Sequence, residues 1–129
     1  MGRYYYGDIQ GKFMFAVQPS DAGERFGAYE TPMEPDFIEY AVCRESSYDD
    51  IRKELDSIVK SGAVQRVKHM WQELEEKEGR MSYNDKDREK YGVSNEDIRD
   101  YADWRMGTEM IEFFDENPDK DQLYFSAEL

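Results

Sequence analysis

Segments with the composition of β-strands lie at both ends of this chain, and the sequence between them follows the period of α-helices. At the start, residues 4–9 and 12–17 are rich in aromatic and β-branched side chains and flank Gln10-Gly11, which suits a two-residue hairpin turn. Residues 36–43 and 122–129 alternate as further strands. Strands at both ends with helices between them predict an α+β fold, in which a small antiparallel sheet packs with three to four helices.

The N-terminal hairpin is expected to lie in the middle of the packing. With Gln10-Gly11 as its turn, Tyr4 lies opposite Val17 and Tyr6 opposite Phe15. Both faces of the paired strands then carry apolar side chains, which favours cover on both sides. The C-terminal strand is expected to return to this N-terminal sheet.

Two changes in the pattern mark the first helices. Ser47 followed by Asp50 is a typical helix start. The apolar face then changes side at Ser61-Gly62. This change fits two helices that meet there or one long helix contacted on different sides, and we favour the break.

The last helices are marked by their caps. Residues 82 and 92 bracket a short polar helix. Ser94 with Asp97 at the third position predicts the start of a final helix, which can run to residue 116, where Asn117-Pro118 ends it.

Length, charge and cysteine content limit the class of protein. The 129 residues suit one domain, residues 1–129, and the 15% aromatic content provides for a core despite a formal net charge of −13. That charge disfavours direct binding to nucleic acid or to a membrane surface. The single cysteine excludes an internal disulfide, and we find neither a secretion signal nor an apolar run of about 20 residues. We therefore expect a cytoplasmic protein.

The sequence carries no motif that identifies a reaction. His69 and Glu73 are four residues apart on a predicted helix and could share a metal, but one histidine with carboxylates is a poor zinc site, so a surface histidine is favoured. Cys43 is expected to be a small buried apolar residue. Glycine-rich phosphate loops and the nucleophile motif of hydrolases are absent from the sequence. We expect a non-enzymatic protein without metal or cofactor.

The negative charge is unevenly distributed along the chain. Residues 1–71 hold twelve acids and nine bases, whereas residues 72–129 hold eighteen acids and eight bases. Carboxylates along a rigid helix can compete with the phosphates of a nucleic acid for a basic cleft. This reading predicts an acidic inhibitor that contacts a nuclease or defence complex through residues 73–116, against the simpler alternative of an acidic face that only favours solubility. The candidate contact residues are Glu96, Asp100, Asp103, Trp104, Glu109 and Glu112.

A second hypothesis places a small-molecule site on the N-terminal sheet. Tyrosine rings there could stack on the base of a nucleotide signal, and a nearby cation could bind its phosphate. The candidate residues are Arg3, Tyr4, Tyr5, Tyr6 and Lys12. The oligomeric state and the identity of any partner stay open.

The opening GRYYYGDIQGKFMFAVQPSDAGERFG resembles the N-termini of small proteins of phages and large DNA viruses. Those begin with the pattern G-R-Y-Y-x-G-D-I-x-G-K-F-x-F, followed by a turn rich in Ser and Asp that ends in F-G. The resemblance covers residues 2–27, and the family has no assigned activity, so no site residues carry over. It implies a small viral accessory protein that acts inside an infected bacterial cell, such as an anti-CRISPR or anti-restriction factor.

Overall fold

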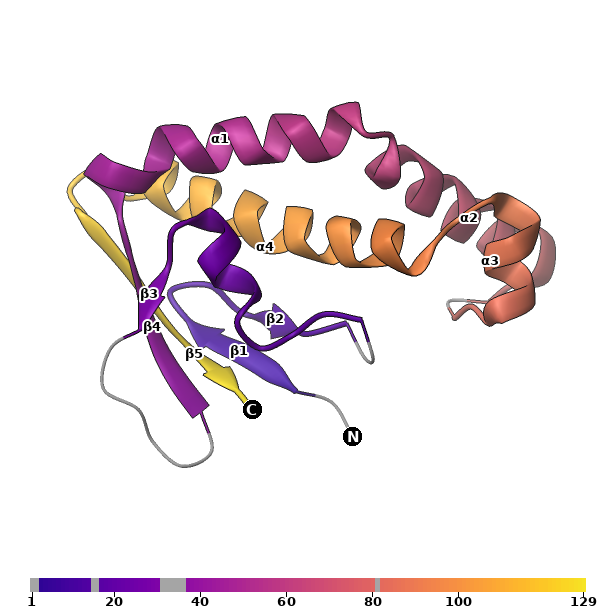
Figure 1. Cartoon of the computed structure of the whole chain (residues 1–129), viewed down its shortest axis with the longest axis horizontal. Helices are drawn as coiled ribbons and strands as arrows, with labels where there is room; N and C mark the ends of the chain where they lie inside the picture. Colours follow the sequence, from indigo (N-terminus) through magenta and orange to yellow (C-terminus); the bar gives the residue numbers. More distant parts are fainter. Residues whose placement is uncertain (1–2, 15–16, 31–36, 81) are drawn as a thin grey trace.

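The computed structural model describes residues 3–14, 17–30, 37–80 and 82–129 (Figure 1). In these residues five strands form one antiparallel sheet, which packs with four α-helices and a 3₁₀ helix, so the predicted α+β fold is confirmed. In chain order the elements are β1 (Tyr4–Gly7), β2 (Gly11–Lys12), η1 (Ala22–Phe26), β3 (Tyr29–Glu30), β4 (Phe37–Cys43), α1 (Arg44–Lys60), α2 (Ala63–Glu78), α3 (Asp85–Tyr91), α4 (Asn95–Glu116) and β5 (Gln122–Glu128). None of the described helices is long and apolar enough to cross a membrane.

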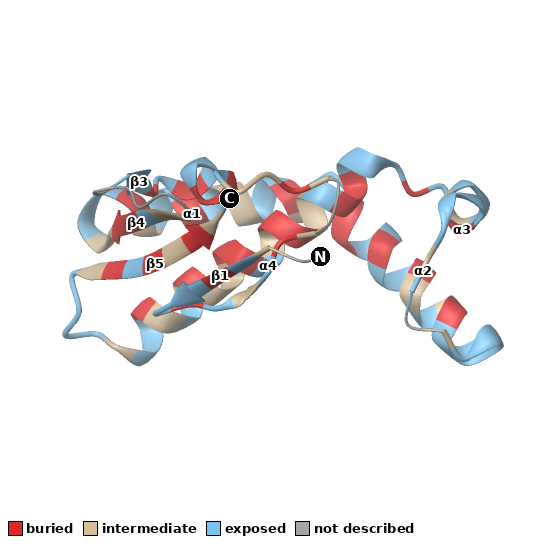
Figure 2. Ribbon diagram, turned by 90° about the horizontal axis from the view of Figure 1, so that it is seen from below, coloured by how far each residue is buried: buried red, intermediate tan, exposed pale blue. Residues whose placement is uncertain are grey.

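The last strand of the chain, β5, occupies the centre of the sheet. The strand order is β2-β1-β5-β4-β3, and β5 pairs with β4 from Gln122 to Glu128 and with β1 on its other side. Buried and exposed residues alternate along β5, as expected for a sheet with one covered face (Figure 2). The predicted return of the C-terminal strand to the N-terminal sheet is confirmed.

The predicted hairpin register is wrong. Tyr4 pairs with Lys12 and Tyr5 with Gly11, so the connection is longer than two residues. Strand β1 ends at Gly7, whose φ of +142° only glycine adopts readily. The next backbone N–H, that of Asp8, donates to the carbonyl of Tyr124 in β5. The paired part of β2 is two residues long and forms one edge of the sheet, not the middle of the packing. The predicted partner Phe15 lies outside the described residues.

Helix α1 begins earlier than its capping signal predicts. It starts at Arg44, directly after β4, and its N-cap makes no side-chain hydrogen bond. Ser47 is instead a buried residue inside the helix. The backbone N–H of Arg44 donates to the carbonyl of Asp121 at 2.8 Å, so a tertiary contact fixes the start of α1.

The remaining helix boundaries follow their sequence signals. Helices α1 and α2 meet at Gly62, whose φ of +87° breaks the helix, as predicted. Helix α3 starts one turn later than residue 82, because Asn84 forms its capping box. The predicted box of α4 is present: Ser94 Oγ accepts from the backbone N–H of Asp97, and the Asp97 carboxylate accepts from that of Ser94.

Two apolar clusters share the long helix α4. The larger one joins the inward side chains of the sheet, such as Phe125, to η1, to α1 and to the C-terminal half of α4. The smaller one joins α2 to the first turns of α4, where Val93 and Ile98 lie together. Helices α2 and α3 extend beyond the sheet (Figure 1).

Arg44 fastens the start of α1 to the end of α4. Its guanidinium donates to the backbone carbonyls of Phe114 (2.8 Å), Asn117 (2.7 Å) and Lys120 (2.8 Å) and lies over the Phe114 ring. The last carbonyls of a helix have no partner within the helix and carry partial negative charge, so a cation stabilises them. Arg44 therefore caps α4 from another element.

Replacing Arg44 tests this cap. Arg44→Met keeps the apolar stem but removes the three donors, and we expect the free energy of unfolding to fall by about 2–3 kcal/mol in urea titrations. Arg52→Met is the control, because Arg52 is exposed and its side chain contacts the Tyr48 hydroxyl and ring without reaching a helix end; it should change stability by less than about 0.5 kcal/mol. Equal effects of the two variants would contradict the capping role.

Candidate functional site

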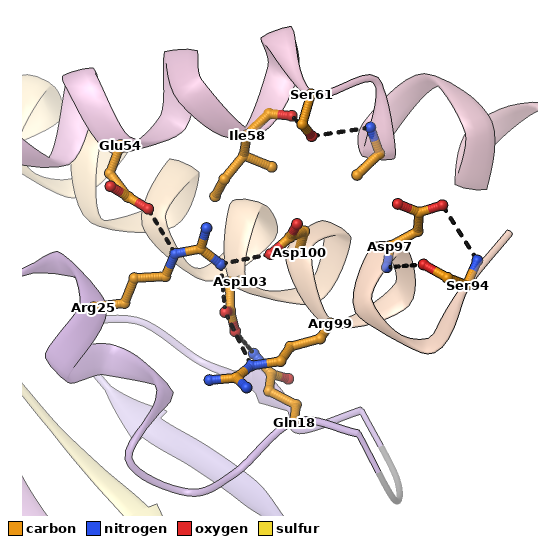
Figure 3. A network of polar contacts seen from close by, with 11 residues as sticks. Gln18, Arg25, Glu54, Ile58, Ser61, Ser94, Asp97, Arg99, Asp100 and Asp103 are labelled. Carbon is orange, nitrogen blue, oxygen red and sulfur yellow. Dashed lines mark hydrogen bonds and ion pairs between the residues drawn. The ribbon is translucent and has the colours of Figure 1, made fainter.

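Arg25 of η1 binds two of the predicted acidic residues inside the molecule (Figure 3). Its guanidinium donates to Asp100 at 2.8 Å and to Asp103 at 2.9 Å, both on α4, and to Glu54 of α1 at 2.8 Å. Gln18 completes the network, since its amide donates to Asp103 at 2.9 Å and its oxygen accepts the backbone N–H of Met14. This network ties the N-terminal loop to both long helices.

Asp103 is therefore not available to a partner. It is 0% exposed, and burial raises the pKa of its carboxyl, against the hydrogen bonds from Arg25 and Gln18 that favour the charged form. Asp100 is half-buried and held by the same arginine. The helical face on which Glu96, Asp100 and Asp103 fall is thus partly internal, and of the three only Glu96 is exposed and unpaired in the described part of the chain.

The spacing of α4 contains the signal that was missed. Asp103 lies three and four residues before Met106 and Gly107, so it shares their buried face of the helix. Gly107 faces Phe26 and Leu55 so closely that a Cβ there would lie within 2.9 Å of both side chains. A buried aspartate needs hydrogen-bond partners, and Arg25 and the buried Gln18 are those partners.

Trp104 is half-buried and already faces a cation. Lys68 Nζ of α2 lies 4.7 Å from the centroid of its ring, and Tyr101 packs beside it. The indole contributes to the contact between α2 and α4, which reduces its exposed area as an anchor for a partner.

Glu109 and Glu112 border a hollow between α4 and the β1–β2 connection. This hollow has a volume of about 250 Å³, and its lining includes four carboxylates; we call it the acidic hollow. Its acids are Asp8, Glu109, Glu112 and Glu116. Glu109 is half-buried and accepts a hydrogen bond from the Tyr5 hydroxyl at 2.6 Å. Burial raises the pKa of the Glu109 carboxyl, although this hydrogen bond and one from the Gln10 backbone favour its charged form.

A larger group of carboxylates belongs to the two segments that Arg44 joins, the start of α1 and the end of α4 with the connection after it. We call this group the acidic end. All its members are exposed, and no ion pair of the described residues includes any of them: Glu45, Asp49, Asp50, Glu112, Asp115, Glu116, Asp119 and Asp121. Asp115 accepts a hydrogen bond from the Tyr48 hydroxyl. Counting charge by halves of the chain could not find this group, because its members come from both halves.

The outward face of the sheet carries exposed tyrosines. Tyr4, Tyr6, Tyr29 and Tyr124 are each about half exposed, and Lys12 Nζ lies 6.0 Å from the ring centroid of Tyr4. Tyr5 faces the opposite way and is buried against Phe13 and Phe125, so it cannot stack on a ligand from outside. Arg3 donates to the Gln18 carbonyl and to Ser20, and it lies over Phe13.

The two residues considered for metal or nucleophilic chemistry have separate surroundings. His69 is exposed on α2 and lies edge-on to the ring of Tyr91. Cys43 is half-buried rather than buried, at the junction of β4 and α1, and hydrogen bonds from Ser46 lower the pKa of its thiol. Among the described residues, no group of three or more His, Cys, Asp or Glu side chains is placed to hold a metal ion.

Removing Arg25 tests the buried network. Among the described residues, Arg25→Met leaves the buried Asp103 carboxylate with a side-chain hydrogen bond from Gln18 alone, and we expect a loss of about 2–3 kcal/mol in unfolding free energy. The control is Arg99→Met, because Arg99 is exposed and its Nε lies 3.9 Å from the same carboxylate, too far for a hydrogen bond. This variant should lower the unfolding free energy by less than about 1 kcal/mol. Urea denaturation would contradict the role of the network if Arg25→Met were as stable as the control.

The raised pKa of Glu109 predicts a pH dependence. A carboxyl whose folded pKa exceeds its unfolded value opposes folding in its charged form, and this cost appears as the pH rises through the two pKa values. Glu109→Gln, which can still accept from Tyr5, should therefore gain stability relative to the wild type at pH 7 but not at pH 3 in thermal unfolding. Glu75→Gln, at an exposed residue of α2, controls for the loss of one charge. A pH-independent effect of Glu109→Gln would contradict the assignment.

Comparisons with known proteins do not decide between these surfaces. No protein-family model, curated protein or solved structure matches this chain. Its function is therefore argued from the carboxylates and tyrosines that the fold leaves exposed.

Proposed function

We propose that this chain is a non-enzymatic acidic binding protein that occupies the basic nucleic-acid-binding surface of a partner protein. The observation that carries the proposal is the acidic end, where carboxylates from residues 45–50 and 112–121 are exposed without ion pairs among the described residues. These segments contain one base, Lys120. Arg44 borders the first of them with its guanidinium directed at backbone carbonyls, and Arg52, two residues after it, lies against Tyr48.

The geometry of this surface supports recognition by charge. Two packed helices and the capped connection after α4 hold the backbone of these segments in place, so little backbone order has to be gained on binding. The acidic hollow shares Glu112 and Glu116 with the acidic end and extends the negative surface towards the sheet. Opposed charges of this kind accelerate association and make it sensitive to salt.

The proposed biological role is counter-defence. The resemblance of residues 2–27 to small viral proteins favours a partner in an infected bacterial cell, and a nuclease complex has the basic channel that such a surface fits. An anti-CRISPR or anti-restriction factor is the most specific form of this proposal. Binding blocks the channel and needs no chemistry from the inhibitor itself.

The nucleotide-binding alternative has less support from the geometry. Of its five candidate residues, Tyr5 is buried, and Arg3 is bonded to Gln18 and Ser20. Tyr4, Tyr6 and Lys12 do share the outward face, but a nucleotide needs cations for its phosphates, and of the five candidate residues only Lys12 offers one there.

Charge reversal at the acidic end tests the proposal. The triple variant Glu112→Lys, Glu116→Lys and Asp119→Lys should lose capture of nucleic-acid-binding proteins from host-cell lysate at low salt, because the attractive charges become repulsive. Cations near the end of α4 also suit its dipole, so the fold should be retained. Proteins held by the wild-type chain should be released by added duplex DNA or tRNA and by high salt, as read by mass spectrometry.

A matched variant separates position from net charge. Glu75→Lys, Glu76→Lys and Glu89→Lys change the total charge equally on α2 and α3, beyond the sheet, at exposed residues. This control should keep the capture. Equal loss in both variants, or captured proteins that neither salt nor nucleic acid releases, would count against mimicry by the acidic end.

A further inference from the structure

A second hollow lies on the outward face of the sheet, and its shape follows from the register of the strands. It has a volume of about 330 Å³. Ser126 of the central strand β5 lies between Tyr6 of β1 and Glu39 of β4, each a direct cross-strand partner. Because serine is small and neighbouring strands are about 4.8 Å apart, the two larger side chains stand roughly 10 Å apart with space between them. Tyr124, two residues earlier on the same face of β5, closes one side; we call this hollow the tyrosine recess.

The lining of the tyrosine recess favours a cation. Tyr6 is 46% and Tyr124 54% exposed, so their rings are open to a ligand, and Glu39 adds a carboxylate. No Lys or Arg is among the described residues that line it, and Lys12 lies over Tyr4, outside the recess. The faces of aromatic rings attract cations, and a protein of net charge −13 adds to the attraction. The same features oppose a phosphate.

The tyrosine recess adjoins the acidic hollow. Gly7 lines both, and a Cβ on Gly7 would lie 2.6 Å from the carbonyl oxygen of Tyr124. Only glycine therefore lets β1 approach β5 this closely between the two hollows. Asp8, the next residue, accepts the backbone N–H of Tyr124 and borders the acidic hollow. A ligand with several cationic groups can thus contact the recess and the carboxylates together.

We infer that the tyrosine recess binds an arginine side chain of a protein partner. The inference rests on the proposed function, in which the partner surface is basic, and it names one contact of that surface. Arginine suits the recess better than lysine, because its planar guanidinium can stack on the ring of Tyr6 or Tyr124. The ammonium of lysine is more strongly hydrated and has no plane to stack.

Two labelled peptides of equal charge test this inference. An amidated peptide of alternating Arg and Gly and its Lys-Gly counterpart are titrated with the full chain at low salt, and binding is followed by fluorescence anisotropy. We expect the arginine peptide to bind more tightly. Tyr6→Leu and Tyr124→Leu should each weaken it by about three- to tenfold, which is the range of a partly exposed cation–π contact. Both should also reduce its advantage over the lysine peptide.

Tyr29→Leu is the matched control. Tyr29 is on the same face of the sheet and 47% exposed, but it does not line the tyrosine recess, so its replacement should leave binding within about twofold. Because all three tyrosines are exposed, the variants should stay folded, which amide NMR spectra verify. In those spectra the arginine peptide should shift the amide signals of Tyr6 and Ser126 to saturation.

The outcomes separate this inference from the proposed function. Equal binding of the arginine peptide by wild type, Tyr6→Leu and Tyr124→Leu overturns the inference that the tyrosine recess binds arginine. Equal affinity of the wild type for the two peptides overturns it as well. If, in that case, the charge reversal at the acidic end still abolishes capture from lysate, the proposed function stands without this contact. If the control variant on α2 and α3 also loses capture while the peptide selectivity is intact, the proposed role of the acidic end is overturned. The binding of arginine by the tyrosine recess then stands.

Discussion

The position of β5 at the centre of the sheet determines most other features of this molecule. Strand β4 leads directly into α1, and α4 leads into β5 through a short connection. Because β4 and β5 are antiparallel neighbours, the start of α1 and the end of α4 have to meet beside the sheet. Arg44 stabilises this meeting by binding the carbonyls at the end of α4, and the carboxylates of both segments are gathered there as a result. The same strand supplies Ser126, the small residue over which the tyrosine recess opens.

The acidic residues fall into two groups, buried carboxylates that are paired and exposed carboxylates that are not buried by the fold. Among the described residues, each buried aspartate forms an ion pair with an arginine from another element or turn: Asp103 with Arg25, Asp97 with Arg66 and Asp87 with Arg80. In the case of Asp97, hydrogen bonds from Arg66 hold the pKa of the carboxyl below its usual range. A buried carboxylate without such a partner would cost several kcal/mol, so these bases are committed to the fold. Most of the other described acids are exposed, and they set the negative electrostatic field around the molecule.

The parts of the fold that could be read from the sequence are those decided locally. The capping box at Ser94 and the break at Gly62 depend on residues within one helical turn, and both were predicted. The hairpin register was missed because only Tyr4 and Tyr5 pair with β2, whereas β1 pairs up to Gly7 with β5, a strand from the other end of the chain. The burial of Asp103 was missed for the same reason. A helical wheel places Asp100 and Asp103 on one side of α4, but it does not show that Arg25, far away in sequence, occupies that side.

The exposed tyrosines and the net charge complement each other. A sheet face with four half-exposed tyrosines would ordinarily favour association between copies of the chain, since large aromatic surfaces gain free energy when they are covered. Two copies that approach face to face each bring a formal charge of −13, however, and like charges repel most strongly at low salt. A cationic partner meets the opposite condition, because the field that separates two copies draws it in and the tyrosine rings attract its charged side chains. On the proposed function, the acidity of the chain therefore opposes contact between two copies of this face and favours its contact with a basic protein.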